Sequence, residues 1–168
     1  TRIEDIASKS GVSKGTLYLY FKSKEELFWE LMFDVIRNYT EFVRSMADEL
    51  ANPVERLKKI IEMFTIIPDW AKNEMKDVFI IFLHAYAQST NSTQAEEKMR
   101  KIYDIFGHIV ADIIKDGIKQ GYFRDIDPYL FESIFTGLFD GLMVQVIFGI
   151  LEPSARVKDF MTDLILYG

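Results

Sequence analysis

The chain has 168 residues, 49% of them apolar and 27% charged, and a formal net charge of −6. That length suits one or two small domains, and the apolar share is enough for a sizeable buried core. The chain contains no cysteine, which excludes a disulfide framework and a thiolate metal site. Because the sequence shows no paired strands, internal repeats or low-complexity stretches either, we expect an all-α protein.

The first 27 residues predict two short helices joined by a tight turn, followed by the start of a third helix. Thr1 can cap the first helix, and Gly11 can end it because glycine adopts the left-handed backbone of a C-terminal cap. Ser13 can cap the second helix and Ser23 the third. A helix, a glycine-containing turn and a short helix form a helix-turn-helix, whose second helix enters the major groove of DNA.

Within this segment one set of positions fits a single family signature: Ala7, Gly11, Val12, Ser13, Gly15, Leu17, Tyr18, Tyr20, Phe21, Lys24 and Leu27. Over these positions the chain resembles the tetracycline-repressor (TetR) family of bacterial and archaeal regulators. The resemblance implies an all-α fold with an N-terminal helix-turn-helix head and a helical ligand-binding and dimerisation body. It places the DNA-binding domain at residues 1–27 and the body at residues 28–168. The family has a further helix before the position of Thr1, so we expect this DNA-binding domain to be N-terminally incomplete.

The resemblance also assigns roles to side chains of the head. Lys14 and Thr16 are the candidates for base contact, and Lys24 is expected to bind phosphate at the N-terminus of the third helix. The complete set of predicted DNA-contact residues is Thr1, Arg2, Ser13, Lys14, Gly15, Thr16, Tyr18, Tyr20 and Lys24. For Tyr18 a purely structural role as a core aromatic residue stays open. Val12, Leu17 and Phe21 are predicted to be core.

The distribution of charge favours DNA contact at one end of the molecule. Residues 1–24 hold five cationic side chains and two carboxylates, a net charge of +3, so the remaining residues carry −9. A basic head on an acidic body fits phosphate contact. On charge alone, the five cations are equally compatible with an ordinary solvated face.

Beyond the head, the spacing of apolar residues predicts helices throughout. The predicted helices cover residues 24–50, 53 to Pro68, 78–87, 93–120, 128–148 and 153–167. The helix over 24–50 is long and amphipathic, and we expect it to link the head to the body.

The helix over 128–148 is apolar on nearly every face, which would leave a large exposed patch on a monomer. It is long enough to span a membrane, but it contains acidic residues and lacks cationic flanks, so we predict no membrane contact. We expect the last two helices of each subunit to form a four-helix bundle across a two-fold axis, as the resemblance implies. The predicted interface residues are Gly137, Gly141, Val157, Phe160, Met161 and Leu164. The alternative is that both helices only complete the monomer core.

No metal or catalytic constellation is recognisable. The two histidines have no metal-ligand spacing, and no glycine-rich phosphate loop or nucleophile–base pair is present, so we predict no enzyme, metal or cofactor. The body is rich in aromatic residues, and ligand pockets are apolar cavities with a few polar groups. The predicted pocket residues are Phe64, Phe82, His84, Tyr86, Tyr103, Phe106, His108 and Phe139. Each histidine is alternatively an ordinary hydrogen-bonded side chain.

Together these features predict a cytoplasmic, homodimeric DNA-binding transcriptional regulator. We expect a repressor that binds a palindromic operator in double-stranded DNA and is released by a small hydrophobic or aromatic effector. The main alternative is a regulator without such an effector, controlled by a protein partner or by its abundance. A helical dimer that binds only other proteins would require the head motif to be a coincidence.

Overall fold

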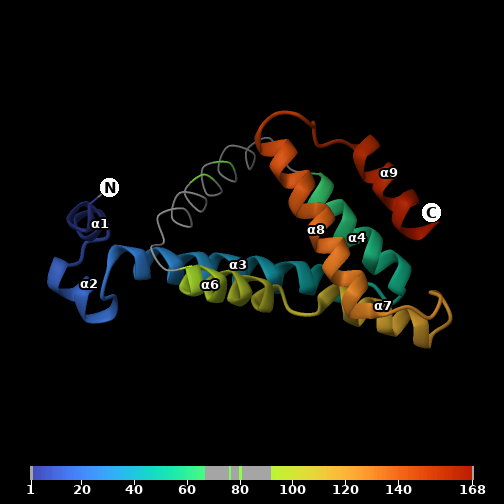
Figure 1. The fold of residues 1–168 in the computed structure, drawn as a ribbon, viewed down its shortest axis with the longest axis horizontal. Helices are drawn as coiled ribbons and strands as arrows, with labels where there is room; N and C mark the ends of the chain where they lie inside the picture. The colour runs from blue at the N-terminus through green and yellow to red at the C-terminus, as the bar shows by residue number, and fades with distance from the viewer. Residues whose placement is uncertain (1, 67–75, 77–79, 81–91, 168) are drawn as a thin grey trace.

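The computed structural model describes residues 2–66, 76, 80 and 92–167. The helices of the described residues are α1 (Ile3–Lys9), α2 (Lys14–Tyr20), α3 (Lys24–Asp48), α4 (Pro53–Thr65), α6 (Ser92–Phe106), α7 (Ile109–Lys119), α8 (Pro128–Ile147) and α9 (Ala155–Leu166). The all-α prediction is therefore confirmed. Figure 1 shows α1 and α2 at one end of the long α3, with α4, α7, α8 and α9 gathered toward its other end. The helix predicted over 78–87 lies outside the described residues.

Side-chain caps fix where the helices of the head begin. The hydroxyl oxygens of Ser13 and Ser23 each accept a hydrogen bond from the backbone N–H three residues ahead, both at 3.0 Å, as predicted. Thr1, the predicted cap of α1, lies outside the described residues. The capping residue of α1 is Arg2, whose backbone N–H donates to the carboxylate of Asp5 at 3.0 Å. A carboxylate in the first turn also interacts favourably with the helix dipole.

The single helix predicted over 93–120 is two helices. Gly107 has a φ of +60°, a left-handed conformation that glycine adopts without steric cost, and it separates α6 from α7. The apolar spacing continues across this break because both helices bury one face, as Ile102 and Ile113 show. Periodicity alone therefore could not reveal the break.

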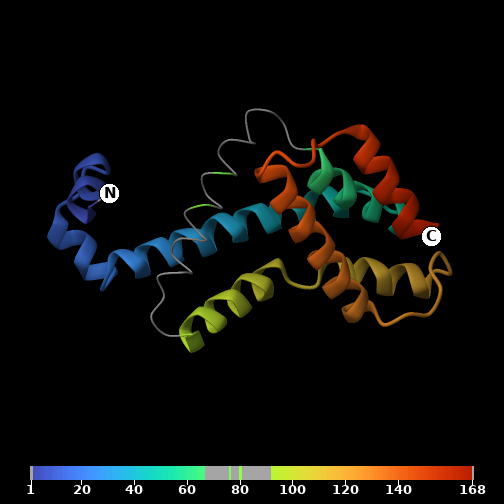
Figure 2. The same ribbon diagram turned by 45° about the horizontal axis from the view of Figure 1, so that its top comes forward.

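Two hydrophobic clusters hold the helices together. The larger cluster joins α3, α4, α7, α8 and α9, and its buried members are Val43, Ala47, Leu57, Ile60, Ile61, Ile109, Val110, Ile113, Ile114, Phe135, Phe139 and Met161. The smaller cluster joins Trp29 and Phe33 of α3 to Ile102 of α6. Figure 2 shows α6 running beside α3, separate from the larger helix group. The long helix is thus buried by different partners along its length.

Arg56 of α4 ties the C-terminal end of α3 to the body. Its guanidinium donates to the carboxylate of Asp48 at 2.7 Å and to that of Asp116 in α7 at 3.0 Å. The Arg56 side chain is only 16% exposed, so these charge-assisted bonds are partly shielded from water. One side chain therefore joins α3, α4 and α7.

We expect Gly117→Ala to destabilise the fold, because a Cβ at this buried position of α7 would lie 2.0 Å from the ring of Phe123. Forcing the ring away should lower the free energy of unfolding by about 1–3 kcal/mol. Gly15→Ala in α2 is the matched control, since its Cβ would meet only the Ser13 hydroxyl at 3.7 Å. Urea denaturation measures both variants. Equal stability of Gly117→Ala and the wild type would contradict the packing of Phe123 on α7.

Candidate nucleic-acid interface and ligand site

The head consists of α1, a turn and α2, packed at the free end of α3. Gly11 in the turn has a φ of +70°, as a glycine-terminated first helix requires. Ile3 and Ala7 of α1 are buried, and Leu17 of α2 is partly buried. Val12, predicted to be core, is 38% exposed, because it lies in the turn and the two short helices cover it only in part.

The outer face of α2 is open. Lys14 and Gly15 are exposed at its start, and Tyr18 and Tyr20 are 47% and 75% exposed further along. Tyr18, for which a core role was the alternative, is thus about half exposed. Leu19 is 84% exposed on the same helix and was not singled out in the sequence. The sequence could have indicated this exposure, because Leu19 lies two residues after the inward-facing Leu17 and therefore on the opposite side of the helix.

The cations available for phosphate lie around the first turn of α3. Lys24 is the first residue of this helix and is exposed, and Lys22 lies in the connection just before it. Within the described residues, neither lysine takes part in an ion pair. A helix N-terminus combines free backbone N–H groups with a positive dipole end, so Lys24 sits where an anion binds well.

The two candidates for base contact both have partners inside the head. The ammonium group of Lys14 donates a hydrogen bond to the carboxylate of Glu4 in α1, and both side chains are about half exposed. The bond from Lys14 lowers the pKa of Glu4, and the same bond raises the pKa of Lys14. The hydroxyl of Thr16 lies 2.8 Å from that of Ser13. Each side chain thus has a partner in the head before it meets DNA.

Those predicted ligand-pocket residues that the structure describes do not form one group. Phe82, His84 and Tyr86 lie outside the described residues. Phe64 and Phe139 touch each other within the larger cluster, with their ring centroids 5.2 Å apart.

The remaining predicted pocket residues lie elsewhere. Phe106 packs instead against the smaller cluster between α3 and α6. His108 lies at the break between α6 and α7, where its Nδ1 is 2.9 Å from the carboxylate of Glu132. The second carboxylate oxygen of Glu132 accepts from the backbone N–H of Val110 at 3.2 Å. His108 is thus a hydrogen-bonded side chain at a helix junction.

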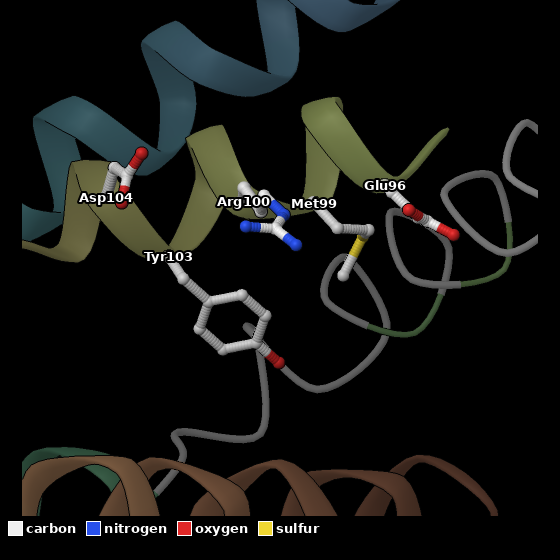
Figure 3. A pocket seen from close by; sticks show the side chains of 5 residues that line it. All are labelled: Glu96, Met99, Arg100, Tyr103 and Asp104. Carbon is white, nitrogen blue, oxygen red and sulfur yellow. The ribbon is translucent and has the colours of Figure 1, made fainter. Parts of the chain in front are cut away.

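Tyr103 connects α6 to α8. Its hydroxyl donates to the carboxylate of Asp140 at 2.6 Å. Burial and this hydrogen bond raise the pKa of Tyr103 to about 12, so the hydroxyl stays protonated and keeps donating at neutral pH. In Figure 3 the Tyr103 ring extends from α6 toward the ribbon of α8.

Beside Tyr103 lies a hollow of about 400 Å³. Its described lining comes from one face of α6 and consists of Glu96, Met99, Arg100, Tyr103 and Asp104 (Figure 3). The four-residue spacing from Glu96 to Arg100 to Asp104 marks this face in the sequence, although the prediction included only Tyr103. Among the described residues, no group of histidine and carboxylate side chains is arranged to hold a metal ion.

An exposed apolar face runs along α8 and α9. Its large side chains are Leu130, Ile134, Leu138, Val144, Phe148, Phe160, Leu164 and Tyr167. Gly137 and Gly141 are exposed on α8, and a Cβ added at either would meet no atom within 4 Å. Met161, predicted to lie on this face, is instead buried in the subunit core, and Val157 packs against that core. Both residues lie on the side of α9 that packs on the larger cluster, so the prediction assigned them to the wrong face of this helix.

Length and composition alone would also allow α8 to cross a membrane. In the part of the chain that the structure describes, α8 is the one helix with this property, and 17% of its most apolar 18-residue stretch is buried in the fold. α9 also has exposed apolar residues, although with 12 residues it is too short for such a span.

Comparison with known proteins agrees with this arrangement. Residues 1–31 match the family described as bacterial regulatory proteins, tetR family. The HTH-type transcriptional repressor KstR2 of Mycobacterium tuberculosis (strain ATCC 25618 / H37Rv) is 28% identical over 135 residues, which cover 76% of this chain and 62% of KstR2. The chain thus spans about three fifths of the length of that relative. The fatty acid metabolism regulator protein of Bacillus subtilis (strain 168) is 24% identical over 169 residues, covering 98% of this chain and 78% of the regulator.

The fold is similar to that of the transcriptional regulator FadR from Bacillus subtilis, whose crystal structure is in complex with stearoyl-CoA. The TM-score is 0.75 at 21% identity, and the match covers 100% of this chain and 88% of the FadR chain. At this identity the likeness concerns the fold alone. These relatives are transcriptional regulators and not enzymes. Over residues 1–31 the chain thus matches the TetR family of transcriptional regulators, and its helical body has a similar fold to FadR.

Proposed function

We propose that this protein is a repressor that binds a palindromic operator as a homodimer and is released by a small hydrophobic effector. The observation that carries the proposal is the open face of α2 together with the exposed Lys24 at the start of α3, both within the segment that matches the family. Residues 1–27 act as the DNA-binding domain, and residues 28–168 bind the effector and the second subunit. A protein that acts on operator DNA works in the cytoplasm, where that DNA lies.

The DNA-binding step uses α2 and the first turn of α3. Lys24 and the backbone N–H groups beside it hold phosphate, which fixes the orientation of the head on the duplex. Lys14 and Thr16, at the start of α2, reach base edges in the major groove. The hydroxyls of Tyr18 and Tyr20, both exposed, add contacts along the same face.

The second subunit covers the apolar face of α8 and α9. Ile134 is 65% exposed and Phe160 is 66% exposed, values that favour a further protein surface over open water. Gly137 and Gly141 lie one helical turn apart, so two copies of α8 can approach closely at these positions. A two-fold dimer places two recognition helices on half-sites related by the same axis, which makes the operator a near-palindrome.

The effector binds in the hollow beside α6 and contains a long apolar chain, for example an acyl thioester. The hollow contains the apolar side chain of Met99 and the ring of Tyr103, with the charged Arg100 between them in sequence. The similar proteins support this class, since the comparisons include a fatty acid metabolism regulator of Bacillus subtilis and the FadR structure of the same species in complex with stearoyl-CoA.

Contacts between α6 and α3 carry the signal toward the head. Lys98 of α6 donates to Glu25 at 2.7 Å and lies 4.9 Å from the ring centroid of Trp29. One turn on, Lys101 lies 3.8 Å from the ring centroid of Phe33. An effector that moves α6 moves these residues of α3, whereas the other end of α3 stays attached to the body. The distance between the two recognition helices then changes, and the dimer no longer fits its operator.

Salt titrations of DNA binding test the head. Lys24→Ala should weaken binding to operator and random duplexes alike and reduce the salt slope by about one unit, because one phosphate contact is lost. Thr16→Ala should change sequence preference instead, with a loss of about 1–3 kcal/mol on the operator if a base contact is removed. Lys119→Ala, on the exposed end of α7, is the control. Operator binding unchanged by both head substitutions would show that α2 does not dock as proposed.

Sedimentation velocity tests the dimer. At micromolar concentration the wild type should sediment as a dimer, whereas Ile134→Glu and Gly141→Glu should yield a poorly soluble monomer, because each places a charge in the apolar interface. Tyr122→Glu introduces the same charge at an exposed aromatic residue away from α8 and α9, and should leave the dimer intact. A stable wild-type monomer under these conditions would exclude the proposed assembly.

Linkage between effector and DNA tests the release mechanism. With stearoyl-CoA as the probe and free CoA as its control, the acyl thioester should weaken operator binding by a coupling free energy of about 1–3 kcal/mol. Operator DNA should weaken binding of stearoyl-CoA by the same factor. Tyr103→Phe should reduce this coupling by removing the bond to Asp140, whereas Tyr122→Phe should not. Tight binding without an effect on DNA would contradict the mechanism, and no binding of any apolar ligand would favour a regulator without an effector.

A further inference from the structure

The ion pair between Glu4 and Lys14 sets one cation of the head apart from the others. Among the described residues, Lys9, Lys22 and Lys24 make no ion pair, whereas Lys14 is bonded to a carboxylate of the preceding helix. The contact joins residues ten positions apart, so it depends on the packing of α1 against α2 and not on one helix face. Lys14, which lies at the N-terminus of the proposed recognition helix α2, is therefore the cation whose charge is offset by a carboxylate.

The position of each partner explains why the pair forms. Glu4 lies in the first turn of α1, where a carboxylate is favoured by the helix dipole. Lys14 is the first residue of α2, where a cation is disfavoured by the dipole of its own helix. The carboxylate of Glu4 offsets that unfavourable interaction. Because both side chains are about half exposed, however, the pair is screened by water and is weak enough to exchange.

We infer that Glu4 is a specificity-determining residue, which holds Lys14 away from phosphate and releases it only to a matching base edge. The inference rests on the proposed DNA-binding function. A lysine prefers the O6 and N7 acceptors of guanine in the major groove, which can replace the carboxylate as its partner. On a duplex without the matching base, Lys14 stays with Glu4, and the head binds only through its other cations. The carboxylate also repels nearby phosphates, which further weakens binding to unrelated DNA.

Glu4→Gln tests this inference, because it removes the charge and keeps the shape of the side chain. For the full-length protein, we expect affinity for a random-sequence duplex to rise about threefold to tenfold and its salt slope to steepen by about one unit, since Lys14 gains a phosphate. Affinity for an operator obtained by in vitro selection should change much less. The ratio of operator to random-duplex affinity should therefore fall.

Asp5→Asn is the matched control. It removes one negative charge from the same helix, keeps an oxygen that can accept from the Arg2 backbone N–H, and does not touch a lysine. A general effect of charge would appear equally in both variants, whereas release of Lys14 appears only in Glu4→Gln. In a Lys14→Ala background, Glu4→Gln should behave like Asp5→Asn. Circular dichroism melts verify that every variant is folded.

Two results would overturn the inference while leaving DNA binding in place. Equal effects of Glu4→Gln and Asp5→Asn on both duplexes would mean that Glu4 contributes only general charge. Loss of operator affinity in Glu4→Gln, to the extent seen in Lys14→Ala, would mean that Glu4 positions Lys14 for contact. Failure of the wild type to bind any duplex would overturn the proposed function together with the inference.

Discussion

The long helix α3 is buried by two unrelated sets of partners, and this division governs the rest of the structure. Its C-terminal part enters the larger cluster through Val43 and Ala47, next to the Arg56 bonds. Among the described residues, its N-terminal part packs through Trp29 and Phe33 on α6. At 25 residues the helix is about 37 Å long, so these regions are well separated. The head therefore depends on α6 for the direction in which it points.

The contacts on the two parts of α3 also differ in chemistry. The body end is held by close-packed aliphatic side chains, which resist displacement because interiors are dense. The α6 end combines two buried aromatic rings with ion pairs of Lys98 and Lys101 to the carboxylates of Glu25 and Glu30, which are about half exposed. Exposed ion pairs are weak and sensitive to salt. The α3–α6 interface is therefore suited to a shift of α6 along α3, whereas the C-terminal part of α3 stays fixed in the body.

Much of the head could be predicted from the sequence, because its signals are local. Caps such as Ser13 and Ser23 act within one helical turn, and a left-handed glycine marks its own position. The Glu4–Lys14 pair could not be predicted, since it depends on how the turn orients α1 toward α2. The Tyr103–Asp140 bond likewise joins residues 37 positions apart. Met161 was misplaced for the same reason: spacing identifies an apolar face of α9, but only the packing shows which partner covers it.

The apolar face of α8 and α9 also ties the stability of the fold to the number of molecules. If a second subunit covers this face as proposed, association removes its apolar residues from water only in the folded state. By mass action, the free energy of unfolding then increases with total protein concentration. A regulator built in this way is least stable when it is scarce. Newly made single subunits, with Ile134 and Phe160 uncovered, are the form most exposed to aggregation and proteolysis.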